Sequence, residues 1–512
     1  MRNGLRRPWG RTWAAETSDR RGPIHLSSFR PPLPALPLVQ VAPSFTDLLA
    51  AAALGARQLE EEGVLSLALP IPARDPLALL PHLGDGHRFR FLWDGAPGLC
   101  LAATGHTNSL VLSGPRRFEM AQRFSAVSLS RLVTVPQFCP AAARPRVLLA
   151  FSFFDSPLQE GNGVAGVEAV LPRWQLSRQG RHCWLRLQRN LGGDVTTRAM
   201  AEELWEQARR LEQLPTDHEA ELPLGRGPGI ASRSPWEAGY REAVTRALEL
   251  VESGALRKLV VAVRQQLQLD RPLDPLQLLA HLRRHQPGSC RFLWQQREGA
   301  ALIGASPERL LTVRQGQLRS DALAGTAPCG PLADQLSRSV KDRHEHELVV
   351  EAITEVLAGA GLSPRRPRHP RLARHGQLVH LHTPITAALG DQQLLALAAA
   401  LHPTPAVAGL PRREAMAWLR SLEPFERGHY AAPIGWIDSA GDAELRVAIR
   451  SGRLHGDQLE LTAGAGLVRG SEPERELQEV ALKLGVLQQQ LNLPLDPAIP
   501  HIRRRASSSL QG

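Results

Sequence analysis

Apolar residues recur at intervals of three and four in two segments of the C-terminal half of the chain. In residues 341–357 this spacing predicts a helix with one buried face. Its apolar stripe consists of Val349, Ala352, Ile353 and Val356. The second segment begins with the capping-box pattern Ser471-Glu472-Pro473-Glu474 and runs toward Leu491. Its stripe consists of Leu477, Val480, Leu484 and Leu487.

Carboxylates lie on or beside both stripes. Glu345 falls on the first stripe, with Asp342 one helical turn earlier. Glu476, Glu479 and Lys483 share the flank of the second helix. A carboxylate on an apolar helix face costs several kcal/mol unless it finds a cation. Oxygen-only ligand sets of this kind suit Mg²⁺, whereas solvated pairs with neighbouring arginines are the alternative interpretation.

Other helices and strands are expected earlier in the C-terminal half. The sequence Ser-Pro-Trp-Glu at 234–237 is a capping box that predicts a helix toward Glu252, ended by Gly254. Residues 258–263 then form a predicted strand, as do residues 291–294 and 300–304. Strands interspersed with helices, without a regular βαβ rhythm, favour an α+β fold over a doubly wound or TIM-barrel fold.

The chain also repeats itself. Residues 75–83 (DPLALLPHL) match residues 274–282 (DPLQLLAHL), and RFLW occurs at both 90–93 and 291–294. Two matches in the same order, at offsets of 199 and 201 residues, predict two related halves. We therefore expect mainly antiparallel sheets packed together with helices outside.

The expected domain organisation follows from this repeat. Residues 1–25 form a basic tail, and residues 26–230 an N-terminal half that is a degenerate, structural repeat. A glycine- and proline-rich linker at 223–229 leads into the C-terminal half, 231–495, and residues 496–512 form a second loose basic tail. The first 21 residues lack the apolar core of a secretory signal, although a transit peptide stays an alternative.

Composition limits the classes of function. No uncharged apolar run is long enough to span a bilayer, and five scattered cysteines without CxxC spacing argue for reduced thiols in the cytoplasm and against structural zinc. The net charge of +11 comes from arginines spread along the chain, with only 5% aromatic residues. This pattern argues against nucleic acid and fits an anionic small-molecule ligand as well.

Lysine is rare in this chain. Of 61 basic residues only Lys258, Lys341 and Lys483 are lysines, and all three lie in the C-terminal half. Arginine keeps its proton in proteins, whereas a buried lysine can become neutral and act as a base. Codon bias without functional meaning is the alternative explanation.

Four further segments could contribute to one site. Glu308 follows a proline turn that leaves a predicted strand, a position that can direct a carboxyl group into a cleft. Residues 322–326 contain Gly-Thr, residues 401–409 contain His-Pro-Thr-Pro, and residues 462–466 contain two glycines that allow a close approach of backbone N–H groups to an anion. Each signal is weak when it is taken alone.

The order and spacing of these motifs resemble the chorismate-utilising enzymes, and within that family the isochorismate synthases. Four segments carry the resemblance. They are the strand that begins at Lys258, the Gly-Ala-Ser-Pro-Glu sequence that ends at Glu308, and residues 341–346 and 473–479. It is dense between Lys258 and Lys483 and rests mainly on the duplication before residue 231. No dinucleotide-binding or P-loop motif is present.

The resemblance implies a reaction and its catalytic residues. Isochorismate synthases add water at C2 of chorismate, a ring diacid, while the C4 hydroxyl leaves. By resemblance Lys258 is the base that activates water and Glu308 the acid that protonates the leaving hydroxyl. This chemistry requires a lowered pKa for Lys258 and a raised pKa for Glu308.

The resemblance also implies a metal and a substrate site. Mg²⁺ would be bound directly by Glu345 and Glu479, and through water by Asp342 and Glu476. The residues expected to bind the substrate are Gly325, Thr326, His380, Tyr430, Arg450, Gly464, Gly466 and Lys483. For His380 a core histidine is the alternative interpretation.

Related functions remain as alternatives. Ammonia-using relatives lack a lysine at position 258, and aminodeoxychorismate synthases carry one where this chain has Ala324, so water is favoured as nucleophile. Salicylate synthases share the acid and base but then eliminate pyruvate. A non-catalytic anion- or nucleic-acid-binding protein is the remaining alternative. We expect a cytoplasmic monomer of menaquinone or phylloquinone biosynthesis, with no membrane, nucleic-acid or amidotransferase partner.

The two halves differ at the expected catalytic positions. The first half contains no lysine, and Thr-Gly-His at 104–106 stands where the second half has Ser-Pro-Glu at 306–308. We therefore expect one active site in each chain.

Overall fold

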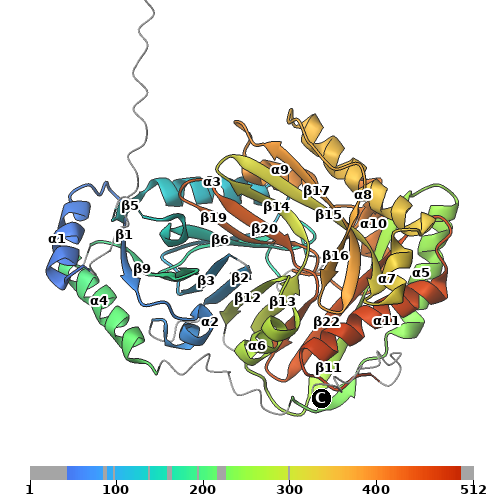
Figure 1. The fold of residues 1–512 in the computed structure, drawn as a ribbon, viewed down its shortest axis with the longest axis horizontal. Helices are drawn as coiled ribbons and strands as arrows, with labels where there is room; N and C mark the ends of the chain where they lie inside the picture. Colours follow the sequence, from blue (N-terminus) through green and yellow to red (C-terminus); the bar gives the residue numbers. More distant parts are fainter. Residues whose placement is uncertain are drawn as a thin grey trace, which may run out of the picture. The chain divides into compact units, whose positions relative to one another are not determined.

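Two facing β-sheets organise the chain (Figure 1). The computed structural model describes residues 43–84, 89–95, 98–136, 139–157, 164–192, 195–215, 227–297 and 300–496. All of them belong to the unit Pro43–Gly512. The predicted basic tails lie outside the described residues except for Asp496, as does most of the predicted linker at 223–229.

Within the described ranges the larger sheet has 13 strands and the smaller one nine. The order in the larger sheet is β10-β11-β22-β21-β13-β12-β2-β3-β8-β9-β1-β5, with β18 paired to β11. The smaller sheet has the order β16-β17-β15-β14-β20-β19-β6-β7-β4. Among the described strands only β1 and β5 pair in parallel. The antiparallel α+β fold expected from the sequence is confirmed.

The strands have the following bounds. Those of the larger sheet are β1 (Val64–Ile71), β2 (Arg90–Gly95), β3 (Leu99–Thr104), β5 (Leu132–Val135), β8 (Trp174–Gln179), β9 (His182–Asn190), β10 (Ile230–Arg233), β11 (Lys258–Leu269), β12 (Cys290–Arg297), β13 (Ala300–Ser306), β18 (Gly409–Leu410), β21 (Ser451–His455) and β22 (Gln458–Leu467). Those of the smaller sheet are β4 (Asn108–Leu112), β6 (Arg146–Phe151), β7 (Val167–Leu171), β14 (Arg309–Arg314), β15 (Gln317–Pro328), β16 (Arg371–His375), β17 (Leu378–Ala388), β19 (Pro433–Asp438) and β20 (Ala443–Val447).

Helices connect the strands and cover the sheets. Their bounds are α1 (Phe45–Ala56), α2 (Pro76–Leu79), α3 (Arg117–Ser130), α4 (Thr197–Gln213), α5 (Glu237–Glu252), α6 (Pro275–His285), α7 (Pro331–Leu336), α8 (Val340–Gly359), α9 (Leu394–Leu401), α10 (Arg412–Leu422) and α11 (Pro473–Gln490), with 3₁₀ turns at Leu80–His82 and Ala141–Ala143. Helix α8 packs on β15, and α11 packs on β22. No helix of the described residues is long and apolar enough to cross a membrane.

The internal repeat appears directly in the strand pairing. The two RFLW segments lie on β2 and β12, which pair antiparallel at the centre of the larger sheet with Leu92 opposite Leu293. Outward from this pair, β3, β8, β9 and β1 on one side match β13, β21, β22 and β11 on the other. Asp75 and Asp274 cap α2 and α6 in the same way, each accepting a backbone N–H bond two residues on. The predicted duplication is confirmed, while the domain boundaries stay a prediction.

A buried aromatic cluster lies where the two halves and the two sheets meet. Phe91, Trp93, Phe292 and Trp294 of the larger sheet share this cluster with Trp436 of the smaller sheet. Because each side chain comes from a central strand, the cluster fixes both sheets at the axis of the repeat. The rigid framework that results carries the site on its C-terminal side.

Two predicted capping boxes are wrong. Helix α5 begins at Glu237 and α11 at Pro473, and neither has a side-chain cap. The hydroxyl of Ser234 instead accepts a hydrogen bond from the backbone N–H of Gln266, and Ser471 accepts one from Val468. Both serines therefore fix neighbouring backbone segments rather than the helix ends, an arrangement that a local sequence pattern does not reveal.

Candidate active site

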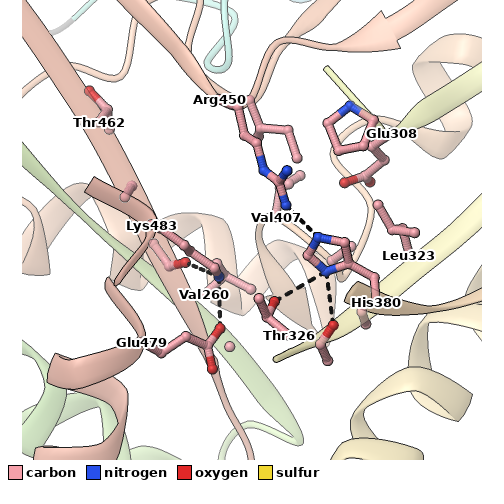
Figure 2. Close-up of a pocket in the computed structure, with 18 of the residues that line it drawn as sticks. Val260, Glu308, Leu323, Thr326, His380, Val407, Arg450, Thr462, Glu479 and Lys483 are labelled. Carbon is pink, nitrogen blue, oxygen red and sulfur yellow. Dashed lines mark hydrogen bonds and ion pairs between the residues drawn. The ribbon is translucent and has the colours of Figure 1, made fainter. Parts of the chain in front are cut away.

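One pocket brings together most of the predicted site residues (Figure 2). Its free volume is about 90 Å³. The predicted residues that line it are Glu308, Gly325, Thr326, Glu345, His380, Tyr430, Arg450, Gly464, Gly466, Glu479 and Lys483.

Glu308 is a buried carboxyl group on the turn between β13 and β14. Ser306 fixes this turn, because its hydroxyl accepts a bond from the Glu308 N–H at 3.2 Å and donates to the Val447 carbonyl at 2.6 Å. Burial raises the pKa of Glu308 to about 8, although the positive charge of Lys258 opposes the shift. Near neutral pH this group is therefore protonated and can donate a proton.

Lys258 lies immediately behind the pocket wall. It begins β11, its side chain is 0% exposed, and its Nζ lies 2.9 Å from Oε1 of Glu345 on α8. Burial of Glu345 opposes ionisation, but the Lys258 charge outweighs it and leaves the pKa of Glu345 below its usual value. Lys258 does not line the pocket itself, but its charge acts on both Glu345 and Glu308.

Gly466 makes room for this ion pair. A Cβ atom at this position would lie 2.2 Å from Oε1 of Glu345 and 3.0 Å from Cε of Lys258. Strand β22 therefore needs glycine here for a steric reason, in addition to the backbone donor role that the resemblance implies. The role of Gly466 toward a substrate stays a prediction.

Each of the three lysines holds one of the predicted metal-binding carboxylates. Besides the Lys258–Glu345 pair, Lys341 contacts Glu476, and Lys483 Nζ lies 2.7 Å from Oε1 of Glu479. Lys483 also donates to the Gly464 carbonyl at 2.7 Å (Figure 2). Three of the four predicted metal-binding acids are thus paired with the chain's only lysines.

The chemistry of these acids fits Mg²⁺, but their positions do not yet form a coordination sphere. Burial raises the pKa of Asp342 and of Glu476, and neighbouring carboxylates, Glu345 for the first and Glu479 for the second, add to the shift. Crowded oxygen donors of this kind attract a hard divalent cation. Across the described ranges, however, no three acidic, histidine or cysteine groups converge closely enough to hold a metal ion.

A hydrogen-bond network joins Arg450 to β15. Nδ1 of His380 contacts the Gly325 carbonyl at 3.0 Å and the Thr326 hydroxyl at 3.3 Å, while Arg450 donates to Nε2 (Figure 2). Burial, with the Arg450 charge, keeps the pKa of His380 well below its usual value. His380 is therefore neutral, carries its proton on Nδ1, and orients the guanidinium of Arg450.

Local backbone strain marks two places in the pocket wall. Arg450 has φ +51° and Ala431, next to Tyr430, has φ +62°. Positive φ is unfavourable for residues with a side chain and persists where surrounding structure imposes it, often at functional sites. Gly325, with φ +72°, forms a β-bulge between Ala324 and Thr326 that directs this part of β15 toward the pocket.

The sequence missed a buried ion pair next to the pocket. Glu423 and Arg427 are almost fully buried and lie within 2.5 Å of each other. Arg427 donates to the carbonyls of Val260 and Val407, both of which line the pocket, and Glu423 accepts the Ala262 N–H. Their i, i+4 spacing is the one signal that could have suggested the pair. Asp342 and Glu476, like Lys258, lie outside the pocket lining.

The fold and the site together define an α+β enzyme with a buried acid, a buried lysine and an acidic cluster around one pocket. The chorismate binding enzyme family model matches residues 48–492. The chain therefore belongs to the chorismate-binding enzymes, which confirms the resemblance seen in the motifs.

Individual relatives agree with this assignment. The salicylate biosynthesis isochorismate synthase of Pseudomonas aeruginosa is 33% identical over 85% of this chain and 92% of its own length. Isochorismate synthase DhbC of Bacillus subtilis is 38% identical over 48% of this chain and 65% of its own length. The solved structure of MenF, the menaquinone-specific isochorismate synthase from Escherichia coli, has a TM-score of 0.69 at 27% identity and covers 87% of this chain and 99% of that one.

Proposed function

We propose that this enzyme is an isochorismate synthase, which adds water at C2 of chorismate while the C4 hydroxyl leaves. The observation that carries the proposal is a buried carboxyl group in the pocket, with its pKa raised to about 8, together with a buried lysine behind the pocket wall whose charge acts on it. The names of the relatives from P. aeruginosa, B. subtilis and E. coli support the same activity.

The two groups have complementary tasks in this proposal. Glu308, which is protonated near neutral pH, donates its proton to the departing C4 hydroxyl. Lys258, once neutral, takes a proton from the attacking water. Its Nζ lies 2.9 Å from Oε1 of Glu345, so the two side chains are in direct contact behind the pocket wall.

The acids of α8 and α11 would hold Mg²⁺. In our proposal Glu345 and Glu479 bind the ion directly, and Asp342 and Glu476 do so through water. When bound, the ion would neutralise the ring carboxylate of the substrate. The oxygen-only donors and the raised pKa values of Asp342 and Glu476 support this assignment.

The opposite side of the pocket would hold the enolpyruvyl carboxylate. Arg450, oriented by His380, would make a forked contact with it, and Tyr430 would donate its hydroxyl. Burial raises the pKa of Tyr430, so its hydroxyl keeps its proton. The remaining substrate contacts in this proposal come from Gly325, Thr326, Gly464, Gly466 and Lys483.

We further propose that the product enters menaquinone or phylloquinone synthesis and that the enzyme acts as a cytoplasmic monomer without an amidotransferase subunit. The similarity to MenF along almost all of that chain supports the quinone route. The P. aeruginosa relative, named for salicylate biosynthesis, makes a salicylate route the second candidate.

Product analysis tests the activity. Purified protein is incubated with chorismate and Mg²⁺, and the products are separated by chromatography. We expect isochorismate without pyruvate, and loss of turnover after chelation with recovery on adding Mg²⁺. Salicylate with pyruvate would identify a salicylate synthase, an aminated product formed with ammonia would identify an aminating relative, and no turnover would favour a binding protein.

A further inference from the structure

A second cavity, of about 350 Å³, lies between the two halves of the repeat and shares no lining residue with the candidate active site. One wall comes from α3 and the segment after β6, and the other from α10 and the loop before it. The cavity is lined by three arginines (Arg117, Arg412 and Arg420) and three phenylalanines (Phe118, Phe153 and Phe154).

Arg117 is a buried cation without a matching anion in this cavity. The residue is 5% exposed, and its Nη2 donates to the Phe153 carbonyl at 3.2 Å. Its Nε and Nη1 atoms are buried and have no hydrogen-bond partner among the described residues. The carboxylate of Asp155 acts on it from a distance, but lies within ion-pair range of Arg420 instead, at 3.9 Å. Buried unpaired donors of a charged group are costly, so a ligand acceptor would relieve this site.

The walls next to Arg117 suit a flat ring. Phe118 stacks on Phe151 with a centroid distance of 4.2 Å, and Phe154 packs edge-on against Phe153 at 4.9 Å. Arg420 lies over Phe154, 4.1 Å from the ring centroid. Phe118, Phe153 and Phe154 thus give the cavity an apolar lining next to its cations.

We propose that this cavity binds a small planar ring carboxylate, with the carboxylate on one edge of the Arg117 guanidinium and the ring against the phenylalanines. A forked contact uses Nη2 together with either Nε or Nη1, so a carboxylate supplies an acceptor for one of the two unpaired donors. Arg412 and Arg420 add positive charge, while Asp155 is the one carboxylate among the described residues of the lining, so these residues favour an anion over a neutral ring.

The cavity is linked to the candidate active site through one short segment. His402 lines the cavity, and five residues later Val407 lines the active-site pocket. Phe153 lies under Arg427 at 4.3 Å, and Arg427 donates to the Val407 carbonyl. A ligand ring that displaces Phe153 would therefore shift Arg427 and, with it, the hydrogen bond to the Val407 carbonyl. This coupling rests on the proposed function, whereas binding itself does not.

Crystals soaked with 4-bromobenzoate test the location, because bromine gives an anomalous signal. We expect a bromine peak beside Phe118 and Phe154, with the carboxylate on Arg117. Peaks in the active-site pocket alone, or no peak at all, would overturn the proposal.

Calorimetry with benzoate tests the recognition. We expect the Arg117→Gln variant to bind benzoate at least tenfold more weakly than the wild type does. We also expect the wild type to bind the uncharged analogue benzamide no more tightly than the variant binds benzoate. Met416→Trp, which fills the slot from α10, should also abolish binding and serves if Arg117→Gln fails to fold. Arg450→Gln changes the candidate active-site pocket and should leave benzoate binding unchanged. If Arg450→Gln lost benzoate binding while Arg117→Gln kept it, benzoate would bind in the candidate active site and the proposal would be refuted.

Kinetics test the coupling separately. Benzoate should change kcat of the wild type without raising KM for chorismate, and should have no effect on Met416→Trp. A purely competitive effect would refute the link to Val407. Absence of any turnover would instead refute the proposed function and leave the binding results intact.

Discussion

The N-terminal and C-terminal halves share one framework, yet the C-terminal half alone carries the candidate active site. Their equivalent helices, α4 and α11, show the difference clearly. In α4, Glu203 pairs with Arg173 at 2.5 Å and with Arg189 at 2.6 Å. In α11, Glu476 and Glu479 pair with lysines. Arginine stays protonated in proteins and can bind a carboxylate through two nitrogens, whereas lysine is a single point charge that can lose its proton.

The strands on which these helices pack differ in the same sense. β9 contains no glycine, whereas β22 has Gly464 and Gly466, and the second of these accommodates the Lys258–Glu345 pair. His106, at the position equivalent to Glu308, is exposed, while Glu308 is buried. A few local exchanges on a shared framework therefore distinguish the half that carries the candidate active site from the half that does not.

Replacing Lys258 should have the largest effect. Lys258→Arg keeps the positive charge next to Glu345 but removes the ability to become neutral. We expect kcat to fall by about 10³-fold or more, within the range for loss of general base catalysis. Circular dichroism and steady-state kinetics check fold and rate. The matched exchange Arg189→Lys in the N-terminal half should leave kcat unchanged, and near-normal turnover by Lys258→Arg would refute the base assignment.

Glu308→Gln should lower kcat by about 10²- to 10⁴-fold, because the amide cannot donate the proton. The pH profile gives a second readout. Since the pKa of Glu308 is about 8, the wild-type rate should fall as pH rises through about 8. A profile without this alkaline limb would contradict the assignment of Glu308 as the acid.

Stability should report the same raised pKa and should fall with rising pH, as activity does, but over a window that begins at lower pH. The folded pKa of Glu308 lies above its ordinary value of 4.5, so the folded state binds the extra proton between about 4.5 and about 8. Wild-type stability should therefore decline as pH rises through this window, and Glu308→Gln should remove that contribution. Thermal melts at pH 5 and pH 8.5 measure it; a constant difference between the two proteins would contradict the raised pKa.

Gly466→Ala should have an intermediate effect. The added methyl group would displace Glu345 and Lys258, so we expect about a 10- to 100-fold loss of kcat/KM, the scale of a misplaced catalytic group. Gly239→Ala on α5, where nothing lies within 4 Å of the new Cβ, is the control and should keep full activity. Equal activity of the two variants would remove the steric argument for glycine at 466.

Glu203→Gln on α4 should have the smallest effect. It breaks a partly exposed pair in the N-terminal half and should cost no more than about 1 kcal/mol in the free energy of unfolding, with kcat unchanged. Glu479→Gln on α11 should instead raise the Mg²⁺ concentration needed for half-maximal rate. If both exchanges altered the Mg²⁺ dependence equally, the two halves would not differ as proposed.

The sequence predicted the fold and most of the site for physical reasons that are local. Helical periodicity located α8 and α11, and the RFLW repeat predicted strands that turned out to pair with each other. The pairing of each lysine with one acid could not be predicted, because it depends on how α8, β11 and α11 approach one another. The Arg117 cavity was missed for the same reason, since it joins segments far apart in the chain. Glu423 and Arg427 are close in sequence, but their contacts with Val260 and Ala262 depend on the fold.

The source of the new oxygen atom tests the central claim most directly, because a base that activates water must leave that water in the product. Turnover of chorismate in H₂¹⁸O, followed by mass spectrometry, should give isochorismate with one ¹⁸O atom at C2 and none in its carboxylates. Product without ¹⁸O would contradict water as the nucleophile, and with it the role assigned to Lys258.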